Sequence, residues 1–395
     1  MSYGHLLNDF LISIFEENID IQYSDVRPEN YILNESLRGY LISIKKEIDN
    51  VYDKWDKNKR LTNKYEYVNT VIHHEVNNVL INTSICSYKP ISRSYFKLIE
   101  ILNLYKFDFP KIMNSFHLAE GPGGFIEAIT NYRKNKNDRY FGITLMKKNN
   151  DVPKWGKIQD FLKQHKNINI IYGPKRDGNL YLKHNLDYVK STYYNKFDFI
   201  TGDGGFDYSV DFNRQEENSI NLIFCEVLYA LILQKQNGSF VLKVFDCFHK
   251  QTTEILFLLT YFYNEVHFYK PHTSREANSE KYIVCKGFQN HQNRYSIINA
   301  LTKNFELMET KHITSIFNHG LHSLFLHKVE EVNAIYGQQQ IENILTTLNY
   351  IKENIISNNK EKVDKIKSMN IKKCIQWCKI NNQPIYAFLQ TLCVD

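Results

Sequence analysis

Short apolar runs recur along the middle of the chain, separated by polar and glycine-containing segments. Runs of about four to eight residues that are bounded by turn residues are typical of buried β-strands. We expect strands at Ser115–Ala119, Tyr140–Leu145, Ile168–Tyr172, Phe197–Thr201, Ser239–Phe245, Val266–Tyr269 and Tyr282–Cys285.

A longer pattern between two of these runs predicts a helix over Glu216–Gln234. Its apolar side chains recur every three or four residues and share one helix face: Ile220, Ile223, Phe224, Val227, Leu228 and Leu231. We expect Asn237-Gly238 to stop this helix. Strands that alternate with helices predict an α/β fold with a doubly wound sheet, in which ligands bind beyond the carboxyl ends of the strands.

The pattern divides the chain into three regions. Residues 1–90 are polar and mostly helical in pattern, and they include a basic, aromatic strip over Lys54–Tyr67. Residues 91–290 carry the alternating strands and helices. Residues 291–395 look helical, because apolar side chains keep helical spacing between Ile341 and Ile355, which suits packing or the binding of a protein partner. The basic strip is either a solvated helix face or a surface that meets phosphate and stacks bases.

Composition narrows the class of protein. The 395 residues are 43% hydrophobic and 23% charged, as in an ordinary globular protein, and a net charge of +6 permits a nucleic-acid partner without demanding one. No apolar stretch is long enough to span a membrane, and we expect neither membrane contact nor a signal peptide. Seven scattered cysteines, an odd number, indicate free thiols in a reducing compartment.

The segment from Phe116 to Phe125 reads F-H-L-A-E-G-P-G-G-F and joins a predicted strand to a helix. Glycines let a ligand approach the backbone, and the start of the helix supplies oriented amides. The segment lacks the G-K-[ST] ending of a phosphate loop and the G-x-G-x-x-G pattern. An acid before such a turn suits a zwitterion such as the methionine end of S-adenosylmethionine, and a purely structural turn is the alternative.

Two charged residues stand at strand positions where chemistry is expected. Asp203, followed by two glycines, comes at the carboxyl end of the strand Phe197–Thr201. Lys243 interrupts the apolar strand Ser239–Phe245, where an ammonium must be paired or functional because its burial is costly. Burial lowers the pKa of a lysine, which is what a general base requires. An ordinary turn is the alternative for Asp203.

Two further segments carry candidate residues. Ser92–Leu102 has the pattern of an amphipathic helix and carries Lys97, and Glu280 enters the last predicted strand after a polar loop that begins at Lys270. No metal site is expected. Cys374 and Cys378 lie one helical turn apart without partners for zinc.

Two histidine-containing segments are rejected as sites. The segment His73-His74-Glu75 has Asn78 where H-E-x-x-H needs its second histidine. His117 lies inside a predicted strand, and we expect it to be a hydrogen-bonded core residue rather than a ligand.

Five of these segments, in this order, resemble the FtsJ/RrmJ-type RNA 2′-O-ribose methyltransferases: Ser92–Leu102, Glu120–Phe125, Asp203–Gly205, Leu242–Phe245 and Ser274–Cys285. That family carries a Lys-Asp-Lys-Glu tetrad, which maps to Lys97, Asp203, Lys243 and Glu280. Asp203–Phe206, Asn213–Glu216, Lys243–Asp246 and Lys270–Glu280 look like the cap-specific mRNA (nucleoside-2′-O-)-methyltransferases in particular. The resemblance covers roughly half of the chain, and related proteins occur in large cytoplasmic DNA viruses.

The resemblance implies a fold, a cofactor and a set of site residues. The fold is a Rossmann-like S-adenosylmethionine-dependent methyltransferase sheet with helices on both faces over residues 91–290, with helical N- and C-terminal flanks. The tetrad Lys97, Asp203, Lys243 and Glu280 is catalytic, with Lys243 as the base. The residues that bind S-adenosylmethionine are Ala119, Glu120, Gly121, Pro122, Gly123, Gly124, Phe125, Asp177, Asn179, Leu180 and Asp203. The residues that bind RNA are Arg93, Asn213, Arg214, Gln215 and Asn278, with Arg275 and the strip Lys54–Lys64 as further contacts.

Two positions depart from the family pattern. Many members carry an acid for the ribose hydroxyls at the end of the second strand, whereas Tyr140–Leu145 has none; the cap enzymes look similar there. Asn179 stands where an Asp is usual, and Asp177 is the residue that could compensate.

The resemblance predicts an S-adenosylmethionine-dependent RNA 2′-O-methyltransferase that acts on the first transcribed nucleotides of capped mRNA. Its setting is cytoplasmic or nuclear, or a viral factory or virion if the source is a virus. Trp55, Tyr65, Tyr67 and Tyr88 are candidates to stack a cap guanine. The alternatives are the same reaction on uncapped rRNA or tRNA, and a catalytically idle RNA-binding scaffold, against which the intact tetrad argues.

Overall fold

The computed structural model describes residues 4–8, 13–27, 33–76, 79–146, 155–205 and 212–390, and they form two compact units. The first unit comprises residues 1–35, 106–270 and 280–334, and the second comprises residues 36–105, 271–279 and 335–395. The predicted division into three regions at residues 90 and 290 follows the sequence pattern and stays a prediction.

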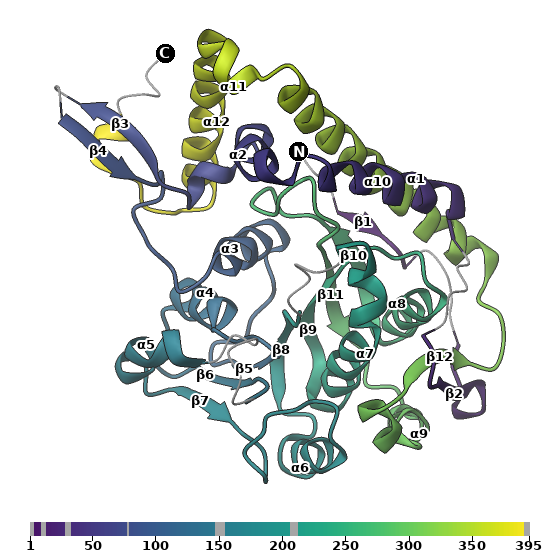
Figure 1. Ribbon diagram of the computed structural model, residues 1–395. Helices are drawn as coiled ribbons and strands as arrows, with labels where there is room; N and C mark the ends of the chain where they lie inside the picture. The colour runs from purple at the N-terminus through teal and green to yellow at the C-terminus, as the bar shows by residue number, and fades with distance from the viewer. Residues whose placement is uncertain are drawn as a thin grey trace. The chain divides into compact units, whose positions relative to one another are not determined.

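An eight-stranded sheet forms the centre of the first unit (Figure 1). Its order is β1 (His5–Leu6), β10 (Tyr263–Tyr269), β11 (Lys281–Phe288), β9 (Gln234–Val244), β8 (Phe197–Gly202), β5 (Asn114–Leu118), β6 (Arg139–Ile143) and β7 (Ile168–Ile171). The five strands from β9 to β7 run parallel, and β11 is antiparallel to both of its neighbours. All seven strands expected from the apolar runs are present, with ends shifted by a few residues.

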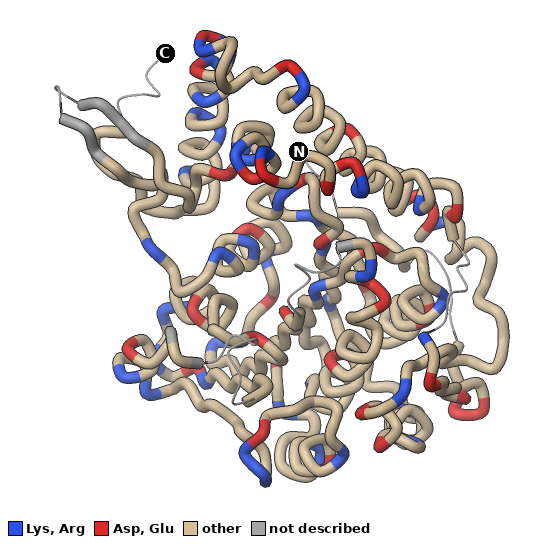
Figure 2. The backbone as a smooth tube through the Cα atoms, viewed as in Figure 1, with Lys and Arg blue, Asp and Glu red and all other residues tan. Residues whose placement is uncertain are grey.

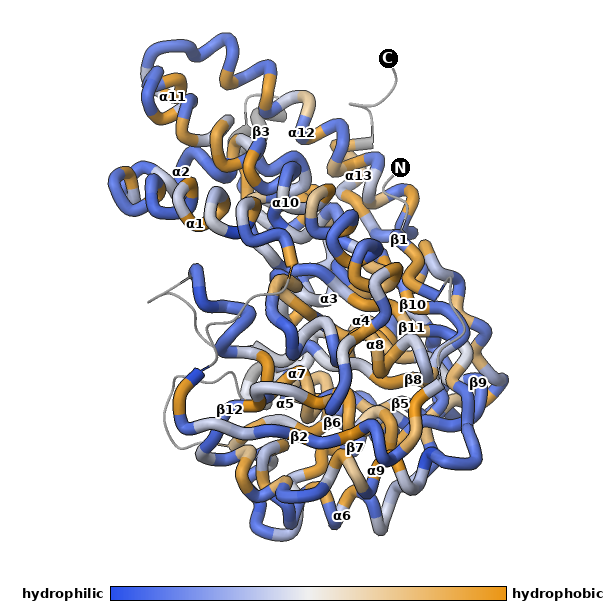
Figure 3. Tube along the Cα trace, turned by 90° about the vertical axis from the view of Figure 1, so that its right-hand side faces the viewer, coloured by the Kyte–Doolittle hydropathy of each residue, from blue (hydrophilic) through white to orange (hydrophobic). Residues whose placement is uncertain are grey.

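Helices cover both faces of this sheet, as a doubly wound fold requires. In Figure 1, α4 (Gly124–Arg133) and α5 (Gln159–Gln164) lie on one side, and α6 (Lys183–Tyr193), α7 (Gln215–Leu233) and α8 (Lys250–Phe262) lie on the other. Few charged residues mark the central strands in Figure 2, and hydrophobic segments concentrate along those strands and on α7 and α8 in Figure 3. This α/β arrangement confirms the predicted fold class.

The end of α7 differs from the prediction. The helix ends at Leu233, and Asn237-Gly238 lies inside β9, which begins at Gln234. The buried side chain of Gln234 donates to the carbonyl oxygens of Phe197 and Asp198 and accepts from the hydroxyl of Tyr263 at 3.1 Å. These tertiary hydrogen bonds fix the start of the strand, so the local turn signal does not set the end of the helix.

A buried arginine satisfies the last carbonyl groups of α7. Arg294 begins α9 (Arg294–Leu301) and is 1% exposed. Its guanidinium donates to the carbonyl oxygens of Leu231 at 2.8 Å, Ile232 at 3.0 Å and Gln234 at 2.9 Å. The final carbonyls of a helix have no partner within the helix and carry partial negative charge, which is why a cation is stabilising here.

Smaller elements complete the first unit. A two-stranded sheet pairs β2 (Ile19–Ser24) with β12 (His312–Phe317). Short 3₁₀ helices are η1 (Glu16–Asn18), η3 (Trp155–Ile158), η4 (Phe212–Arg214) and η5 (Phe305–Glu309). The region 1–90, predicted as mostly helical, therefore contains short strands as well as helices. The strand β2 reads Ile-Asp-Ile-Gln-Tyr-Ser, in which apolar and polar residues alternate, so its sequence carries a strand signal that the prediction of a mostly helical region passed over.

The second unit is mainly helical. Its helices are α1 (Glu35–Asp49), α2 (Tyr52–Thr62), η2 (Glu66–Val68), α3 (Ser94–Tyr105), α11 (Ile355–Asn358), α12 (Lys360–Ile380) and α13 (Ala387–Gln390), and β3 (Ile72–Val76) pairs with β4 (Val79–Thr83). The helix α10 (Ser323–Lys352) begins in the first unit and continues in the second. The helical spacing predicted through Ile355 breaks at Asn354, whose φ of 49° starts a separate helix.

We expect Arg294→Met to lower the free energy of unfolding by at least about 3 kcal/mol, because several buried carbonyl groups lose a charged donor. Chemical denaturation measures this change. Arg139→Met, at an exposed position on β6, is the matched control and should change stability by less than about 0.5 kcal/mol. Equal effects of the two substitutions would contradict the capping role of Arg294.

Candidate active site

The glycine-rich turn lies at the carboxyl end of β5, where it leads into α4. Gly123 has a φ of 111°, which side chains rarely adopt, and the first turn of α4 follows directly. The backbone N–H of Gly121 donates to Thr144 Oγ1 at 3.3 Å, which ties the turn to the end of β6. The predicted strand–turn–helix is confirmed.

Glu120 has a structural function within this turn. Its carboxyl is fully buried, and Oε1 accepts the backbone N–H of Ile126 at 2.7 Å. Burial raises the pKa of Glu120 well above its usual range, and the nearby Asp203 raises it further. Its role as a cofactor ligand stays a prediction.

His117 lies beneath the same turn. Its ring nitrogens contact Ser115 Oγ at 2.8 Å and Thr201 Oγ1 at 2.7 Å, and Nδ1 lies 3.2 Å from Glu120 Oε2. Burial lowers the pKa of His117 to about 3. The prediction of a hydrogen-bonded core histidine is confirmed.

Asp203 and Lys243 meet at the carboxyl ends of β8 and β9. Lys243 Nζ lies 3.2 Å from Asp203 Oδ1 and donates to the carbonyl oxygen of Asp203 at 2.7 Å. The hydroxyl of Tyr282, the cross-strand neighbour of Lys243 on β11, donates to Asp203 Oδ1 at 3.1 Å. The side chains of Lys243 and Asp203 are only 11% and 12% exposed, so the two opposite charges compensate each other where water has limited access.

A fourth polar residue lies below this cluster. Glu226 on α7 is completely buried, and its Oε1 accepts the backbone N–H of Gly204 at 2.9 Å. A Cβ atom at position 204 would lie 2.6 Å from Glu226 Oε1 and 2.7 Å from Leu222 Cδ2. The first glycine after Asp203 is therefore required by packing on α7, and approach of a substrate need not explain it.

The segment after β7 carries the residues predicted to bind adenosine. Asp177 accepts hydrogen bonds from the backbone N–H of Asn179 at 2.9 Å, from Asn185 Nδ2 at 2.6 Å and from His184 Nε2 at 2.9 Å. Asn179 Oδ1 accepts the backbone N–H of Tyr181, and Leu180 is buried. The carboxylate of Asp177 thus organises this loop, and its contact with a ribose stays a prediction.

The loop after β8 enters α7 through η4, which holds the predicted RNA contacts Asn213 and Arg214 before Gln215 starts the helix. Arg214 is exposed, and its Nε lies 4.0 Å from Glu217 Oε2. The neighbouring Glu216 is buried and accepts the backbone N–H groups of Phe248 at 3.1 Å and His249 at 3.0 Å. This fixes the start of α7 to the segment that follows β9. Phe206 lies outside the described residues.

The other two predicted tetrad members, Glu280 and Lys97, belong to different units of the structure. Glu280 starts the part of the first unit that leads into β11, and its carbonyl oxygen accepts Lys270 Nζ at 2.8 Å. Lys97 lies on α3 of the second unit, so its place in the tetrad stays a prediction. The structure therefore brings Asp203 and Lys243 together by direct contact.

Two arginines predicted to bind RNA have a partner inside the second unit. Arg93 Nη1 lies 3.0 Å and Arg275 Nη2 lies 2.9 Å from Oε1 of Glu66, whose side chain is 1% exposed. Burial disfavours the charged form of Glu66, but the two guanidinium groups more than offset this and hold its pKa far below the usual range. Each arginine side chain is about one third exposed, so RNA contact remains open to part of each group.

The loop 271–279, which carries Asn278, is held in the second unit by a second buried glutamate. Glu100 on α3 accepts from the backbone N–H of His272 at 2.8 Å, from His272 Nδ1 at 2.7 Å and from Trp377 Nε1 at 2.8 Å. Asn278 Oδ1 accepts the hydroxyl of Ser274 at 3.3 Å. The loop conformation is thus set by buried carboxylates.

The aromatic candidates for cap stacking divide into two groups. Trp55 and Tyr67 are buried and cannot stack an external base. Tyr65 is half-buried with its ring 4.9 Å from that of His272, and Tyr88 is half-buried with its ring 5.1 Å from that of Tyr95. Burial of an aromatic side chain depends on tertiary packing, which the local sequence does not reveal.

Sequence reasoning missed Glu226 and Tyr282. Glu226 falls between Cys225 and Val227 in an almost wholly apolar helix, and an acid in such a run is a signal that it has a buried partner. Tyr282 could have been found from the pairing of β9 with β11, since it faces Lys243 across the ladder. Neither signal identifies the partner without the fold.

The described residues show no group of three or more His, Cys, Asp or Glu side chains arranged to hold a metal ion. The six cysteines in these ranges are buried free thiols, including Cys374 and Cys378 on α12. Over the same ranges, every helix is too short or too polar to cross a membrane.

Several known proteins are similar to this chain. "Cap-specific mRNA (nucleoside-2'-O-)-methyltransferase 2" of Mus musculus is 26% identical over 309 residues, which are 75% of this chain and 39% of the relative. "Cap-specific mRNA (nucleoside-2'-O-)-methyltransferase 1" of Drosophila melanogaster is 36% identical over 43% of this chain and 21% of the relative. The corresponding enzyme of Autographa californica nuclear polyhedrosis virus is 32% identical over 51% of this chain and 75% of the relative.

The chain thus spans about two fifths of the length of the mouse relative. The family model of FtsJ-like methyltransferases matches residues 90–288, half of the chain. This range contains the β5–α4 turn, the Asp203–Lys243 pair and Tyr282. On this match and the relatives' similarity, the chain belongs to the FtsJ-like methyltransferase family.

Proposed function

We propose that this chain transfers a methyl group from S-adenosylmethionine to the ribose 2′-hydroxyl of RNA. The observation that carries the proposal is the direct contact of Lys243 with Asp203 at the carboxyl ends of β8 and β9. The glycine-rich β5–α4 turn lies at the carboxyl end of the adjacent strand in the sheet. Ligands of doubly wound sheets bind along this edge.

The residues at the β5–α4 turn fit the methyl donor. Between Gly121 and Gly124 the only side chain is that of Pro122, so the polar end of a ligand can approach the backbone at the start of α4. We propose that residues 119–125 hold the methionine end and that Asp177, Asn179 and Leu180 border the adenosine. S-adenosylmethionine supplies a methyl group already activated on a sulfonium.

Lys243 is the base in this proposal. A neutral Lys243 Nζ accepts the proton of the 2′-hydroxyl while the 2′-oxygen forms its bond to the methyl carbon and the carbon–sulfur bond breaks. Asp203 orients Nζ through its carboxylate and its carbonyl oxygen, and Tyr282 fixes the carboxylate. The proton ends on Lys243 and the sulfur becomes a neutral thioether, so atoms and charge balance.

We propose capped mRNA as the substrate. The support is the similarity over 75% of this chain to a protein named for methylation of the mRNA cap region, and the similarity to a viral protein of the same name. Asn213, Arg214 and Gln215 follow the Asp203 loop and are the residues proposed to contact the RNA beside the reacting nucleotide, together with Asn278. Lys97 and Glu280 complete the proposed tetrad.

We expect S-adenosylmethionine to bind without a metal ion and Gly123→Val to abolish this binding. A β-branched residue cannot adopt a φ of 111° without strain, so the turn moves and blocks approach to the backbone. Calorimetry in the presence of EDTA measures the affinity, and Gly320→Val, at an open surface position, is the control. An unchanged affinity in the Gly123 variant would remove the donor assignment.

We expect Lys243→Ala to lower the rate of methyl transfer by about 10²–10⁴-fold, because the reaction loses its base. Lys243→Arg should not restore the rate, since a guanidinium does not release its proton in this pH range. The assay uses methyl-labelled donor with RNA carrying an N7-methylated cap, an unmethylated cap or no cap, and digestion of the product locates the methyl group.

The matched control is Lys235→Ala, which removes a lysine from the opposite end of β9, where it pairs with Asp198 at 3.1 Å. It should keep wild-type activity. Substantial transfer by Lys243→Arg would reject Lys243 as the base. Equal transfer to capped and uncapped RNA would reject the cap requirement, and the absence of transfer to every RNA would reject the function.

A further inference from the structure

Glu226 has an oxygen atom for which the described part of the chain supplies no hydrogen-bond partner. Its Oε1 accepts the N–H of Gly204, whereas Oε2 is buried without a donor. Burial raises the pKa of Glu226 to about 8, and Asp203 raises it too, while Lys243 and the N–H of Gly204 lower it. At neutral pH the group therefore carries a proton.

The segment Gly202–Gly204 contacts both Glu226 and Lys243. A Cβ atom added at Gly202 would lie 2.9 Å from the carboxyl carbon of Glu226, and one at Gly204 would lie 2.6 Å from Oε1. Asp203 stands between these glycines and contacts Lys243 with both its carbonyl and its carboxylate. A shift of the Glu226 carboxyl thus moves the groups that orient Nζ.

We propose that Glu226 is a positioning residue for methyl transfer. Its carboxyl fixes the backbone of Asp203 and Gly204. The carboxyl must be uncharged in this role, because a charged Glu226 would keep Lys243 in its ammonium form. This inference rests on the proposed function. The charged groups around Glu226 are Asp203 after β8 and Lys243 on β9, and the thiol of Cys225 is beside it on α7. An ionised Glu226 would add a second carboxylate near Lys243 and favour its protonated form, which cannot accept a proton.

The test compares the pH dependence of kcat in Glu226→Gln and Glu226→Ala with that of the wild type. Glutamine cannot ionise but still offers an oxygen to Gly204, so activity is retained and the rise of kcat with pH moves to lower pH. Alanine gives the same displacement, but its maximal rate falls by about 10–100-fold because the Gly204 N–H loses its acceptor and the backbone shifts.

A residue that only stabilises the fold would change the melting temperature and leave the pH profile in place. Wild-type profiles in both variants would overturn the inference while leaving the proposed function intact. If Glu226→Ala does not fold, the pH at which kcat rises in Glu226→Gln decides the question alone. A wild-type chain without methyl transfer to any RNA would overturn the proposed function itself.

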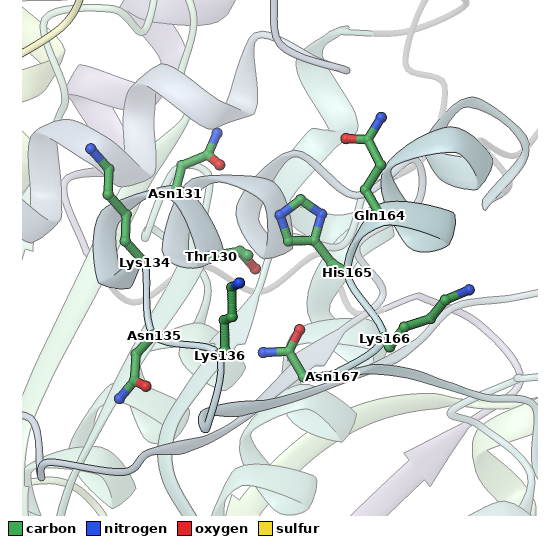
Figure 4. A pocket seen from close by; sticks show the side chains of 9 residues that line it. All are labelled: Thr130, Asn131, Lys134, Asn135, Lys136, Gln164, His165, Lys166 and Asn167. Atoms are coloured by element: carbon green, nitrogen blue, oxygen red, sulfur yellow. The ribbon is translucent and has the colours of Figure 1, made fainter.

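A hollow lies at the amino ends of β6 and β7, at the end of the sheet opposite to the proposed active site (Figure 4). Its volume is about 660 Å³. It is lined by Thr130, Asn131, Lys134, Asn135, Lys136, Gln164, His165, Lys166 and Asn167. None of the residues predicted to bind the methyl donor or RNA lines this hollow.

The hollow is positively charged without a compensating acid. Lys134, Lys136 and Lys166 form no ion pair with any residue in the described ranges. The neighbouring acid, Asp138, is buried and is already paired with Arg133 at 2.7 Å. Three like charges around one hollow repel each other, and an anion relieves that repulsion.

The polar walls of the hollow are held in place by hydrogen bonds. Asn167 Nδ2 donates to the carbonyl oxygen of Asp138 and Asn135 Nδ2 donates to that of Lys111, both at 2.8 Å. The ring of His165 stacks on that of Phe161 with 4.0 Å between centroids. The walls are therefore preorganised, whereas the exposed lysines can adapt to a ligand.

We propose that the sugar–phosphate backbone of the RNA substrate, downstream of the methylated nucleotide, binds this hollow. This inference also rests on the proposed function. Most of the lining side chains are exposed or half-exposed, which suits a strand that crosses the hollow better than an enclosed small molecule. The five residues of β6 rise by about 3.3 Å each, so the hollow at the amino ends of the strands lies about 16 Å from the proposed active site at their carboxyl ends. Only an RNA longer than the reacting nucleotides reaches both places.

The test measures the affinity of capped RNAs for a variant in which Lys134, Lys136 and Lys166 are all replaced by alanine. A capped RNA of a few nucleotides should bind as it does to the wild type. A capped RNA of several tens of nucleotides should bind more weakly, and the slope of its log affinity against log salt should fall by about two units, as expected for three lost phosphate contacts to a single strand.

The control variant replaces Lys183, Lys190 and Lys196 by alanine, which removes the same charge from α6 and from the segment between α6 and β8. Equal weakening by both triple variants, or equal weakening of short and long RNA, would overturn the assignment of the hollow. Loss of inorganic phosphate binding with unchanged long-RNA affinity would assign the hollow to a free anion and reject RNA. Absence of RNA binding to the wild type would instead reject the proposed function.

Discussion

The contact between Lys243 and Asp203 is the constraint on which the rest of the site depends. A lysine on a central strand has to be compensated, because an isolated ammonium is unstable away from water. The compensating carboxylate follows the adjacent parallel strand, so the contact requires β8 and β9 to pair in the observed register. Tyr282 adds a second fixed donor from β11. The mixed sheet thus sets the geometry of the pair through its strand order.

The sequence was informative wherever a signal is local. Apolar runs predicted the seven strands, the helical spacing of apolar residues predicted α7, and the family motifs identified the β5–α4 turn, Asp203 and Lys243. Long-range contacts explain what escaped. The start of β9 at Gln234 depends on carbonyl groups of β8, and the capping of α7 depends on an arginine some sixty residues later. The burial of Trp55 and Tyr67 likewise depends on packing in the second unit.

The predicted RNA contacts show the same limit. Arg93 and Arg275 match the family pattern, but a basic residue in a polar loop has the same local sequence whether it faces RNA or a buried acid. The acid here is Glu66, inside the basic strip Lys54–Tyr67. Without the fold, nothing in the strip distinguishes Glu66, which pairs with both arginines, from Asp56, which is exposed.

Buried carboxyl groups hold the loops of the first unit by one repeated arrangement. Glu120 accepts from Ile126, Glu216 from Phe248 and His249, Glu226 from Gly204, and Glu254 from Ile316, in each case from backbone N–H groups of another segment. Burial raises the pKa of each of the four. A folded state that keeps protons which the unfolded chain releases is most stable at low pH, and this contribution is lost as pH rises through the folded pKa. The buried carboxyls that hold these loops therefore make the first unit less stable as pH rises above the ordinary pKa of a glutamate.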